Sequence, residues 1–501
     1  MSGFSRRAIA LGVIAVAAHA AGLVGQAASP PPADQGPSTL HYKGITITPG
    51  GFLAAETVVR QNAIGADINT PFNSTPFAGS SQAALSEFNA TARQSRLSML
   101  FEGHPGSTVA TGYFEMDFLG TGVTSNANQS NSYVLRFRQA WAQAAFGGGW
   151  TLSGGQMWSL LAERKRSTDN RTEAPPLVID PQYTVGFSWA RQYGLRLADK
   201  LSDNATFAVS AENPQTIFGG HGFPTNFVLG AAGVGGGLFN NQANYSFNVA
   251  PDFIGKLAFD GGFGHLEIFG LVSFFRDRIF PCSAASVATP CATNGTTVPS
   301  AAGATNSSAT GTGAGVNLRI PLFSKHLDFG LHFFGGSGVG RYGTSGLPDA
   351  TVDPNGNLKV LQNFQALGTL EWHLKKADVY LYVGDEYAGD QVFTIGAPAK
   401  GEGYGSPLFA NGACGTETLP TGNYAVGALG SCTGDTKNIV EGSIGFWHRL
   451  LKGPSGTLQW GLQYSYLIRY TWPGVGAAAG TTAAPEAMNN MFFTSFRYVL
   501  P

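Results

Sequence analysis

Residues 363–374 read NFQALGTLEWHL, and their side chains alternate between two kinds. One alternating set is apolar or small and consists of Phe364, Ala366, Gly368, Leu370, Trp372 and Leu374. The set between them is polar and consists of Asn363, Gln365, Thr369, Glu371 and His373, with Leu367 as the one exception. Because successive side chains of a β-strand point to opposite faces, the pattern predicts a strand with one apolar and one polar face.

The same alternation recurs along most of the chain. Residues 265–274 and 457–469 show it clearly. Reading the sequence in this way gives about sixteen candidate strands. Their centres lie near residues 52, 98, 114, 139, 155, 190, 209, 256, 271, 317, 333, 367, 383, 445, 464 and 495.

The connections between these strands alternate between short and long. The short ones are near residues 104–107, 147–149, 199–204, 261–264, 323–326, 375–378 and 451–456. The long ones are residues 61–92, 120–131, 161–182, 214–248, 280–310, 343–357, 391–437 and 473–488. This arrangement predicts an all-β fold, a transmembrane antiparallel up-and-down β-barrel of about sixteen strands with short periplasmic turns and long extracellular loops. A soluble, secreted sandwich or solenoid is the alternative, but large apolar residues on nearly every strand favour the barrel.

The amino terminus has the pattern of an export signal. Arg6 and Arg7 precede an apolar run that extends to about Gly25. We expect a signal peptide at residues 1–27, cleaved after residue 20 or 27, with an uncleaved anchor helix as the alternative. A short periplasmic segment at residues 28–44 and the barrel at 45–501 would follow. No later stretch has roughly eighteen consecutive apolar residues, so the rest of the chain is expected to cross the outer membrane as strands.

Composition supports an exported barrel. Charged residues make up 12% of the chain, below the roughly 25% of soluble domains, and 69 residues are Gly. No long basic block suggests binding to nucleic acid. The cysteines form two local pairs, Cys282 with Cys291 and Cys414 with Cys432, which we interpret as loop disulfides. Neither pair has CxxC spacing or a nearby His, so we expect no metal site and no cofactor.

If the apolar faces meet lipid, the polar faces line a lumen. Nine charged residues fall on these faces and are predicted to line the pore: Arg96, Glu102, Glu115, Asp117, Arg136, Arg138, Lys256, Arg319 and Arg469. They could select solutes by charge, or they could pair with one another and hold the wall rigid. Both interpretations remain open on the sequence alone.

The third long loop carries the densest charge in the chain. Its candidates for a constriction are Glu163, Arg164, Lys165, Arg166, Asp169 and Arg171, and Glu173 and Asp180 follow them. The loop is expected either to fold into the barrel and narrow it, or to remain a solvated outer loop. In both cases the cations at residues 164–166 would raise the local concentration of anions.

Signatures of catalysis are weak. The sequence has no GxSxG, HExxH or P-loop motif. His265, His332 and His373 lie on lumen-facing positions and could serve an outer-membrane hydrolase. Single histidines of this kind also occur in polar channels, so we expect no enzymatic activity.

Four short stretches in the first third of the chain carry a family resemblance. They are residues 92–97 (ARQSRL), 112–118 (GYFEMDF), 135–140 (LRFRQA) and 155–159 (GQMWS). In order and spacing they resemble the DcaP-like family of trimeric porins. The resemblance implies a homotrimer, a preference for small anionic or dicarboxylic compounds, and contact between these anions and Arg96, Arg136 and Arg138. Residues 28–40 lack the heptads of the coiled coil that some members carry, and the chain ends in Pro501 where an aromatic residue is usual.

Together these features predict a passive diffusion channel for small polar or anionic solutes, in contact with outer-membrane lipid and lipopolysaccharide. Two alternatives remain. One is a substrate-specific or gated uptake channel. The other is a closed barrel with a structural or adhesive role.

Overall fold

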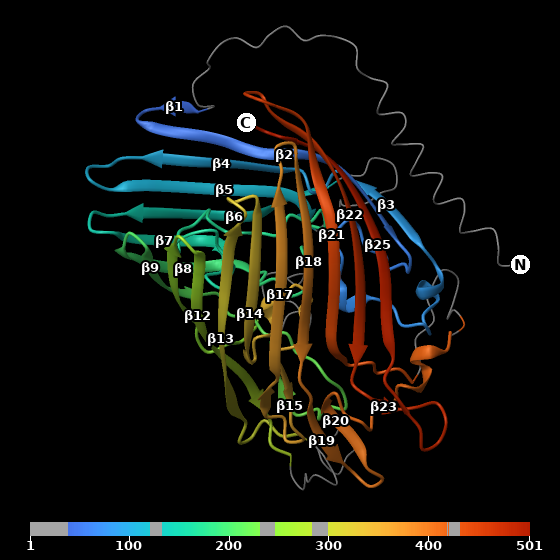
Figure 1. Ribbon diagram of the computed structural model, residues 1–501. Helices are drawn as coiled ribbons and strands as arrows, with labels where there is room; N and C mark the ends of the chain where they lie inside the picture. The colour runs from blue at the N-terminus through green and yellow to red at the C-terminus, as the bar shows by residue number, and fades with distance from the viewer. Residues whose placement is uncertain (1–38, 121–132, 231–245, 283–298, 418, 420–430) are drawn as a thin grey trace, which may run out of the picture. The chain divides into compact units, whose positions relative to one another are not determined.

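The computed structural model describes residues 39–120, 133–230, 246–282, 299–417, 419 and 431–501. Its central feature is a sheet of antiparallel strands that closes on itself (Figure 1). The sixteen wall strands are β2 (Ile45–Arg60), β4 (Arg96–Gly103), β5 (Val109–Gly120), β6 (Val134–Ala145), β7 (Trp150–Trp158), β8 (Arg191–Ser202), β9 (Ala205–Glu212), β11 (Asp252–Gly261), β12 (Gly264–Ile279), β13 (Thr305–Leu322), β14 (Leu327–Ser337), β17 (Gln362–His373), β18 (Ala377–Ala388), β21 (Thr436–Gly453), β22 (Gly456–Thr471) and β25 (Glu486–Val499).

Pairing between the first and last wall strands closes the barrel. β25 pairs with β22 on one side and with β2 on the other, where the register runs from Phe52 opposite Val499 to Arg60 opposite Met491. β2 in turn pairs with β4. Each of the sixteen described wall strands therefore pairs with a neighbour on both sides, which a barrel surrounded by lipid requires. The predicted fold class is therefore confirmed.

Smaller elements extend the wall and its loops. β1 (Leu40–Tyr42) and β3 (Glu87–Thr91) both pair with β2. The remaining elements lie in long loops: β10 (Phe227–Val228), β15 (Ala350–Val352), β16 (Leu358–Val360), β19 (Gln391–Ile395), β20 (Lys400–Tyr404), β23 (Gly474–Val475), β24 (Thr482–Ala483), and the 3-10 helices η2 (Phe72–Ser74), η3 (Ser81–Ala84), η4 (Gly340–Tyr342) and η5 (Gly412–Gly415). Among the described residues, none of these helices is long and apolar enough to span a membrane.

The predicted strand positions agree with the structure with one small exception. Fifteen of the centres fall inside wall strands, whereas residue 190 lies one residue before β8. The predicted turn at 199–204 was too long, because β8 continues to Ser202 and pairs there with β9. Of the predicted loop at 120–131, residues 121–131 lie outside the described residues.

Strand β17 shows which face of the barrel each of the two alternating sets of side chains occupies. Phe364 and Trp372 are 44% and 53% exposed on the outer face, whereas Asn363 and Glu371 are 2% and 4% exposed on the inner face. The exception in the pattern, Leu367, points inward and belongs to the largest buried apolar cluster. The apolar residues therefore cover the outside of the barrel and the polar residues face its interior, which is the reverse of a soluble protein.

Candidate functional site: the barrel interior and its inner loop

The interior is occupied by the segment that connects β7 and β8, residues 159–190, called here the inner loop. Its backbone is held by carboxylates of the opposite wall. The Val185 N–H donates to Glu441 of β21 at 2.9 Å, and the Gly186 N–H donates to Glu386 of β18 at 2.8 Å. All four residues are buried, so these charge-assisted hydrogen bonds fix the loop against the wall.

Glycines allow this contact to be close. A Cβ at Gly384 of β18 would lie 1.8 Å from the carbonyl oxygen of Val185. Gly186 has φ +86°, and a Cβ there would lie 2.0 Å from the carbonyl oxygen of Ala366. Neither position accepts a side chain without moving the backbone, so glycine at both positions sets how near the inner loop lies to β17 and β18.

The start of the inner loop is fixed to the other side of the barrel. Glu163 accepts from Arg319 of β13 at 3.1 Å, and Lys256 of β11 donates to the carbonyl oxygen of Ala162 at 2.9 Å. Burial raises the pKa of Glu163 to about 7, although Arg319 acts in the opposite direction. The loop is thus anchored to strands on both sides of the interior.

The remaining charged candidates of this loop divide into two groups. Arg164 is fully buried and donates to the carbonyl oxygens of Leu160, Ala162 and Asp169. Lys165, Arg166, Asp169 and Arg171 are exposed. The guanidinium of Arg171 lies 5.0 Å from the centre of the Tyr113 ring of β5.

An ion-pair network lines the wall at β4, β5 and β6. Arg138 donates to Glu115 at 2.6 Å and to Asp117 at 2.7 Å, and all three side chains are buried. Arg136 makes a bidentate contact with Asp117 at 2.9 Å, but its side chain remains 34% exposed. Arg96 lies 3.7 Å from Glu115. Three arginines against two carboxylates leave the network with a net charge of +1.

The other predicted pore-lining residues lie apart from this network. Lys256 pairs with Glu267 at 2.9 Å and is buried. Arg319 pairs with Glu371 at 3.0 Å as well as with Glu163. Glu102 is half-buried and lines a cavity at the short-turn end of the barrel.

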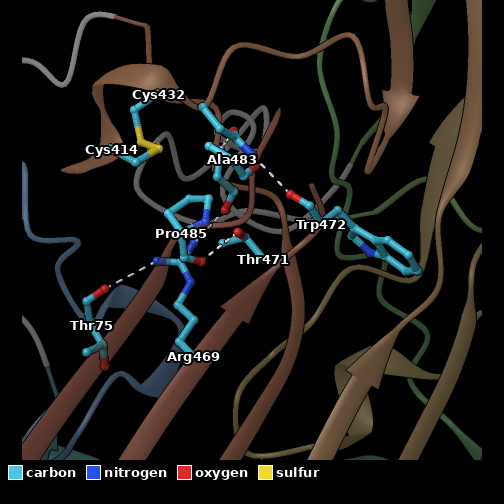
Figure 2. Close-up of a disulfide and its surroundings, with 10 residues drawn as sticks. Thr75, Cys414, Cys432, Arg469, Thr471, Trp472, Ala483 and Pro485 are labelled. Atoms are coloured by element: carbon cyan, nitrogen blue, oxygen red, sulfur yellow. Dashed lines mark hydrogen bonds between the residues drawn. A yellow bond between two sulfur atoms is a disulfide. The ribbon is translucent and has the colours of Figure 1, made fainter. Parts of the chain in front are cut away.

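Arg469 and one disulfide lie near the base of the long loops (Figure 2). The Arg469 guanidinium donates to Thr436 at 2.7 Å and to the carbonyl oxygen of Thr75 at 3.4 Å. The predicted disulfide between Cys414 and Cys432 is present. For the other predicted pair, Cys282 is described, but Cys291 lies outside the described residues.

The candidate histidines each contact a different part of the barrel or its inner loop. His265 contacts Asp260 at 2.8 Å, and His332 contacts Ser188 of the inner loop at 3.2 Å. His373 lies with Asp328 and Glu371 in a group whose ligand atoms are within 4.8 Å of one another, an arrangement that could hold a metal ion. Arg319 already contacts both carboxylates of that group, at 3.5 and 3.0 Å, and so offsets part of their charge.

A cavity of roughly 400 Å³ lies beside the end of the inner loop and is called here the Arg191 cavity. The Arg191 guanidinium lies 5.0 Å from the centre of the Trp158 ring and 5.3 Å from that of Trp189. Its buried Nη1 has no hydrogen-bond partner among the described residues. A second lining cation, Arg341, is balanced by Asp252 at 2.5 Å.

The other groups that line the Arg191 cavity are neutral. Among the described residues, no Asp or Glu lines it. Its polar lining consists of Asn69, Asn73, Ser74, Gln182, Gln192, Thr344 and Ser345. Sequence reasoning missed Arg191 and Arg341, although the motif Trp189-Ala190-Arg191, a cation beside an aromatic residue with no adjacent acid, was visible in the sequence.

Comparison with known proteins supports the fold. No protein-family model and no curated protein sequence matches the chain. The outer membrane channel DcaP of Acinetobacter baumannii is similar in structure, with a TM-score of 0.56 and 14% identity over 92% of this chain and 99% of that chain. The barrel has the fold of an outer-membrane porin. At the level of fold, the resemblance predicted from the sequence is confirmed.

Two further porins are similar at a lower level. An anion-selective porin from Comamonas acidovorans has a TM-score of 0.44 and 10% identity over 91% of this chain and 100% of that chain. OmpF of Salmonella typhi, in complex with daunomycin, has a TM-score of 0.43 and 8% identity over 92% of this chain and 100% of that chain.

Replacing Arg138 should destabilise the porin fold far more than replacing Arg136. Arg138→Ala leaves two carboxylates, Glu115 and Asp117, without their buried partner, which costs roughly 3–5 kcal/mol. Arg136→Ala removes a partly exposed partner while Asp117 keeps Arg138, so a loss of roughly 1 kcal/mol is expected. The free energy of unfolding in urea, measured for the protein refolded into lipid vesicles, checks this. Equal losses for the two variants would contradict it.

Asp180 of the inner loop should make stability depend on pH. Its Oδ1 accepts from the N–H groups of Thr70 and Gln182, and its Oδ2 has no hydrogen-bond partner among the residues that the structure describes. Burial raises its pKa to about 6 from 3.8. The folded state then binds a proton at Asp180 more readily than the unfolded state, so the contribution of Asp180 to stability is fully present below pH 4 and is lost as the pH rises through about 6. A shift of roughly two units corresponds to about 3 kcal/mol.

The side chain introduced by Asp180→Asn cannot ionise. Between pH 4 and pH 8, the free energy of unfolding of this variant should therefore fall by about 3 kcal/mol less than the free energy of unfolding of the unmodified protein. A pH-independent cost of the substitution would shift the free energy of unfolding equally at every pH and would leave its slope against pH unchanged. Asp169→Asn, at an exposed position of the same loop, should keep the original slope. A D180N variant with an unchanged slope would show that Asp180 is not responsible.

Proposed function

We propose that this protein is an outer-membrane channel for the passive diffusion of small hydrophilic solutes, with a preference for anions, including dicarboxylates. Sixteen strands leave space for an aqueous lumen, in contrast to an eight-stranded barrel that side chains fill. The outer face of the wall is apolar and the inner face is polar, as in strand β17. The long loops would lie outside the cell and the short turns in the periplasm.

The observation that carries the anion preference is the unbalanced charge of Arg191. Its aromatic neighbours hold the guanidinium in place without cancelling its charge, and no carboxylate among the described residues lines the cavity. The net charge of the nearby ion-pair network has the same sign. An anion that enters the cavity would find a buried donor, Nη1 of Arg191, that has no hydrogen-bond partner in the described part of the chain.

The inner loop supplies the constriction in this proposal. It is anchored to β13 and to β18 and β21, so a solute must pass through the space that remains beside it. The exposed cations Lys165, Arg166 and Arg171 would raise the concentration of anions next to the loop. Of the nine wall residues predicted to line the pore, the half-buried Arg96, Glu102, Arg136 and Arg469 are assigned to the same passage. Arg136 keeps the exposure needed to meet a solute, whereas the buried Arg138 serves the wall.

A substrate-specific channel is the second candidate. It is favoured by the size of the Arg191 cavity and by its amides and hydroxyls, which could hold one small anion. Transport that saturates at low solute concentration would identify it. Transport that rises linearly with concentration would identify simple diffusion.

Single-channel recording in a planar bilayer with a salt gradient tests the proposal. We expect stepwise currents whose reversal potential reports anion preference, and Arg191→Gln should lower the permeability ratio of chloride to potassium roughly twofold, because a fixed charge in a narrow passage concentrates counter-ions. Lys376→Gln removes the same charge from an exposed short turn and should leave the ratio unchanged. Cation preference, or no current from folded protein, would refute the channel proposal.

We also propose that three chains assemble, as the family resemblance implies. On the outer face, Gly112 of β5 lies opposite Ala142 of β6, which lies opposite Gly154 of β7. Small residues in a row allow two walls to approach closely in a membrane. The mass of the detergent-solubilised protein should correspond to three chains. A mass near that of one chain would contradict the trimer.

A further inference from the structure

The outer face of β12 changes character along its length. From the short-turn end, its outward side chains are Leu266, Ile268, Gly270, Val272 and Phe274, followed by Arg276 and Arg278. The alternation is unbroken, because the intervening Phe275 and Asp277 are buried on the inner face. Two arginines therefore extend the apolar stripe on the outside of the barrel.

The length of the apolar stripe places these arginines at the edge of the membrane. From Leu266 to Phe274 the strand rises roughly 26 Å at 3.3 Å per residue. At a tilt of about 40° this is roughly 20 Å of height, close to the apolar band of about 25 Å of such barrels. Arg276 thus lies at the level where the hydrocarbon layer ends and the lipid headgroups begin.

Neither arginine is neutralised by an acid among the described residues. The Arg276 Nε donates to the carbonyl oxygen of Phe247 at 2.9 Å, and the Arg278 Nη1 donates to the amide oxygen of Asn306 at 3.1 Å. These bonds position the guanidinium groups and leave donors on each of them available. Within the described ranges, their charges remain without an acidic partner.

The neighbouring strand adds polar groups to the same face. On β13, Ser308 lies opposite Arg276 and Thr310 lies opposite Phe274, and both residues are exposed. The rim patch is defined here as Arg276, Arg278, Asn306, Ser308 and Thr310. It offers two guanidinium groups, two hydroxyls and an amide, and it borders the apolar stripe.

We propose that the rim patch binds the phosphate of an anionic lipid in the outer leaflet, of the phosphorylated glycolipid type found in lipopolysaccharide. A guanidinium fork matches the oxygens of a phosphate, and the apolar stripe beneath it would take the acyl chains. The inference rests on the proposed function, because it requires the barrel to lie in an outer membrane. The row of small residues proposed for assembly is on β5 to β7, so this part of the wall is left for lipid.

The test uses delipidated full-length protein in detergent, titrated with a diphosphorylated lipid A and monitored by native mass spectrometry. The R276Q/R278Q double variant should bind this lipid roughly thirtyfold more weakly, that is by about 2 kcal/mol, since each arginine near an anionic surface contributes about 1 kcal/mol. The K325Q/K376Q double variant removes two exposed charges from the short turns and should bind as tightly as the unmodified protein. Equal binding by the two double variants would overturn the proposal.

Two further probes separate the lipid from its headgroup and from the channel. Dephosphorylated lipid A should bind to the unmodified protein as weakly as diphosphorylated lipid A binds to R276Q/R278Q. Inorganic phosphate at millimolar concentration should not displace diphosphorylated lipid A from the unmodified protein. Displacement by phosphate alone would mean that the patch recognises a free anion, which overturns the lipid assignment. The single-channel current of R276Q/R278Q should equal that of the unmodified protein. Phosphate-dependent lipid binding by a barrel that carries no current would refute the channel and support the rim patch.

Discussion

The pairing of β2 with β25 is the constraint on which the rest of the structure depends. In a hydrocarbon environment an unpaired backbone N–H or carbonyl group costs several kcal/mol, so a sheet is stable there only when it has no edge. The pairing from Phe52 with Val499 to Arg60 with Met491 joins the first and last wall strands and so closes the sheet. Once the sheet is closed, one face meets lipid and the other faces the interior. The apolar set and the polar set of each alternating strand are then each fixed to one face.

Closure of the barrel places polar groups in its interior, where they need hydrogen-bond partners. The inner loop supplies such partners. Carboxylates such as Glu386 and Glu441 are buried on the wall, with no cation among the described residues in hydrogen-bond contact, and they would be costly if left unbonded. The inner loop offers them backbone N–H groups at Gly186 and Val185. The same bonds satisfy the loop's own backbone and hold it across the interior. Wall and loop therefore stabilise each other.

Much of the wall could be predicted from the sequence, because the alternation of a strand is a local property. The sequence of β17 determines both faces of that strand, and its exception, Leu367, belongs to a buried apolar cluster that includes residues of the inner loop. The candidate site was harder to predict. Arg138 is paired, whereas Arg191 has no acidic partner among the described residues, and this difference depends on residues many positions away. The close approach of Gly384 to Val185 likewise depends on a loop distant in sequence. These relations come from the register and from loop packing, which no local pattern encodes.

The contrast between Arg138 and Arg191 shows how a single residue type can serve two purposes. Carboxylates position Arg138 and cancel its charge in the same contact, so it stiffens the wall. The rings of Trp158 and Trp189 position Arg191 through the weak attraction between a cation and an aromatic face, worth about 0.5–2 kcal/mol, and supply no opposite formal charge. A fixed but unbalanced charge is what selection by sign requires, since a mobile side chain would average its field and a paired one would have little field to offer. For this reason the aromatic neighbours of a cation are better evidence of selectivity than the number of cations on the wall.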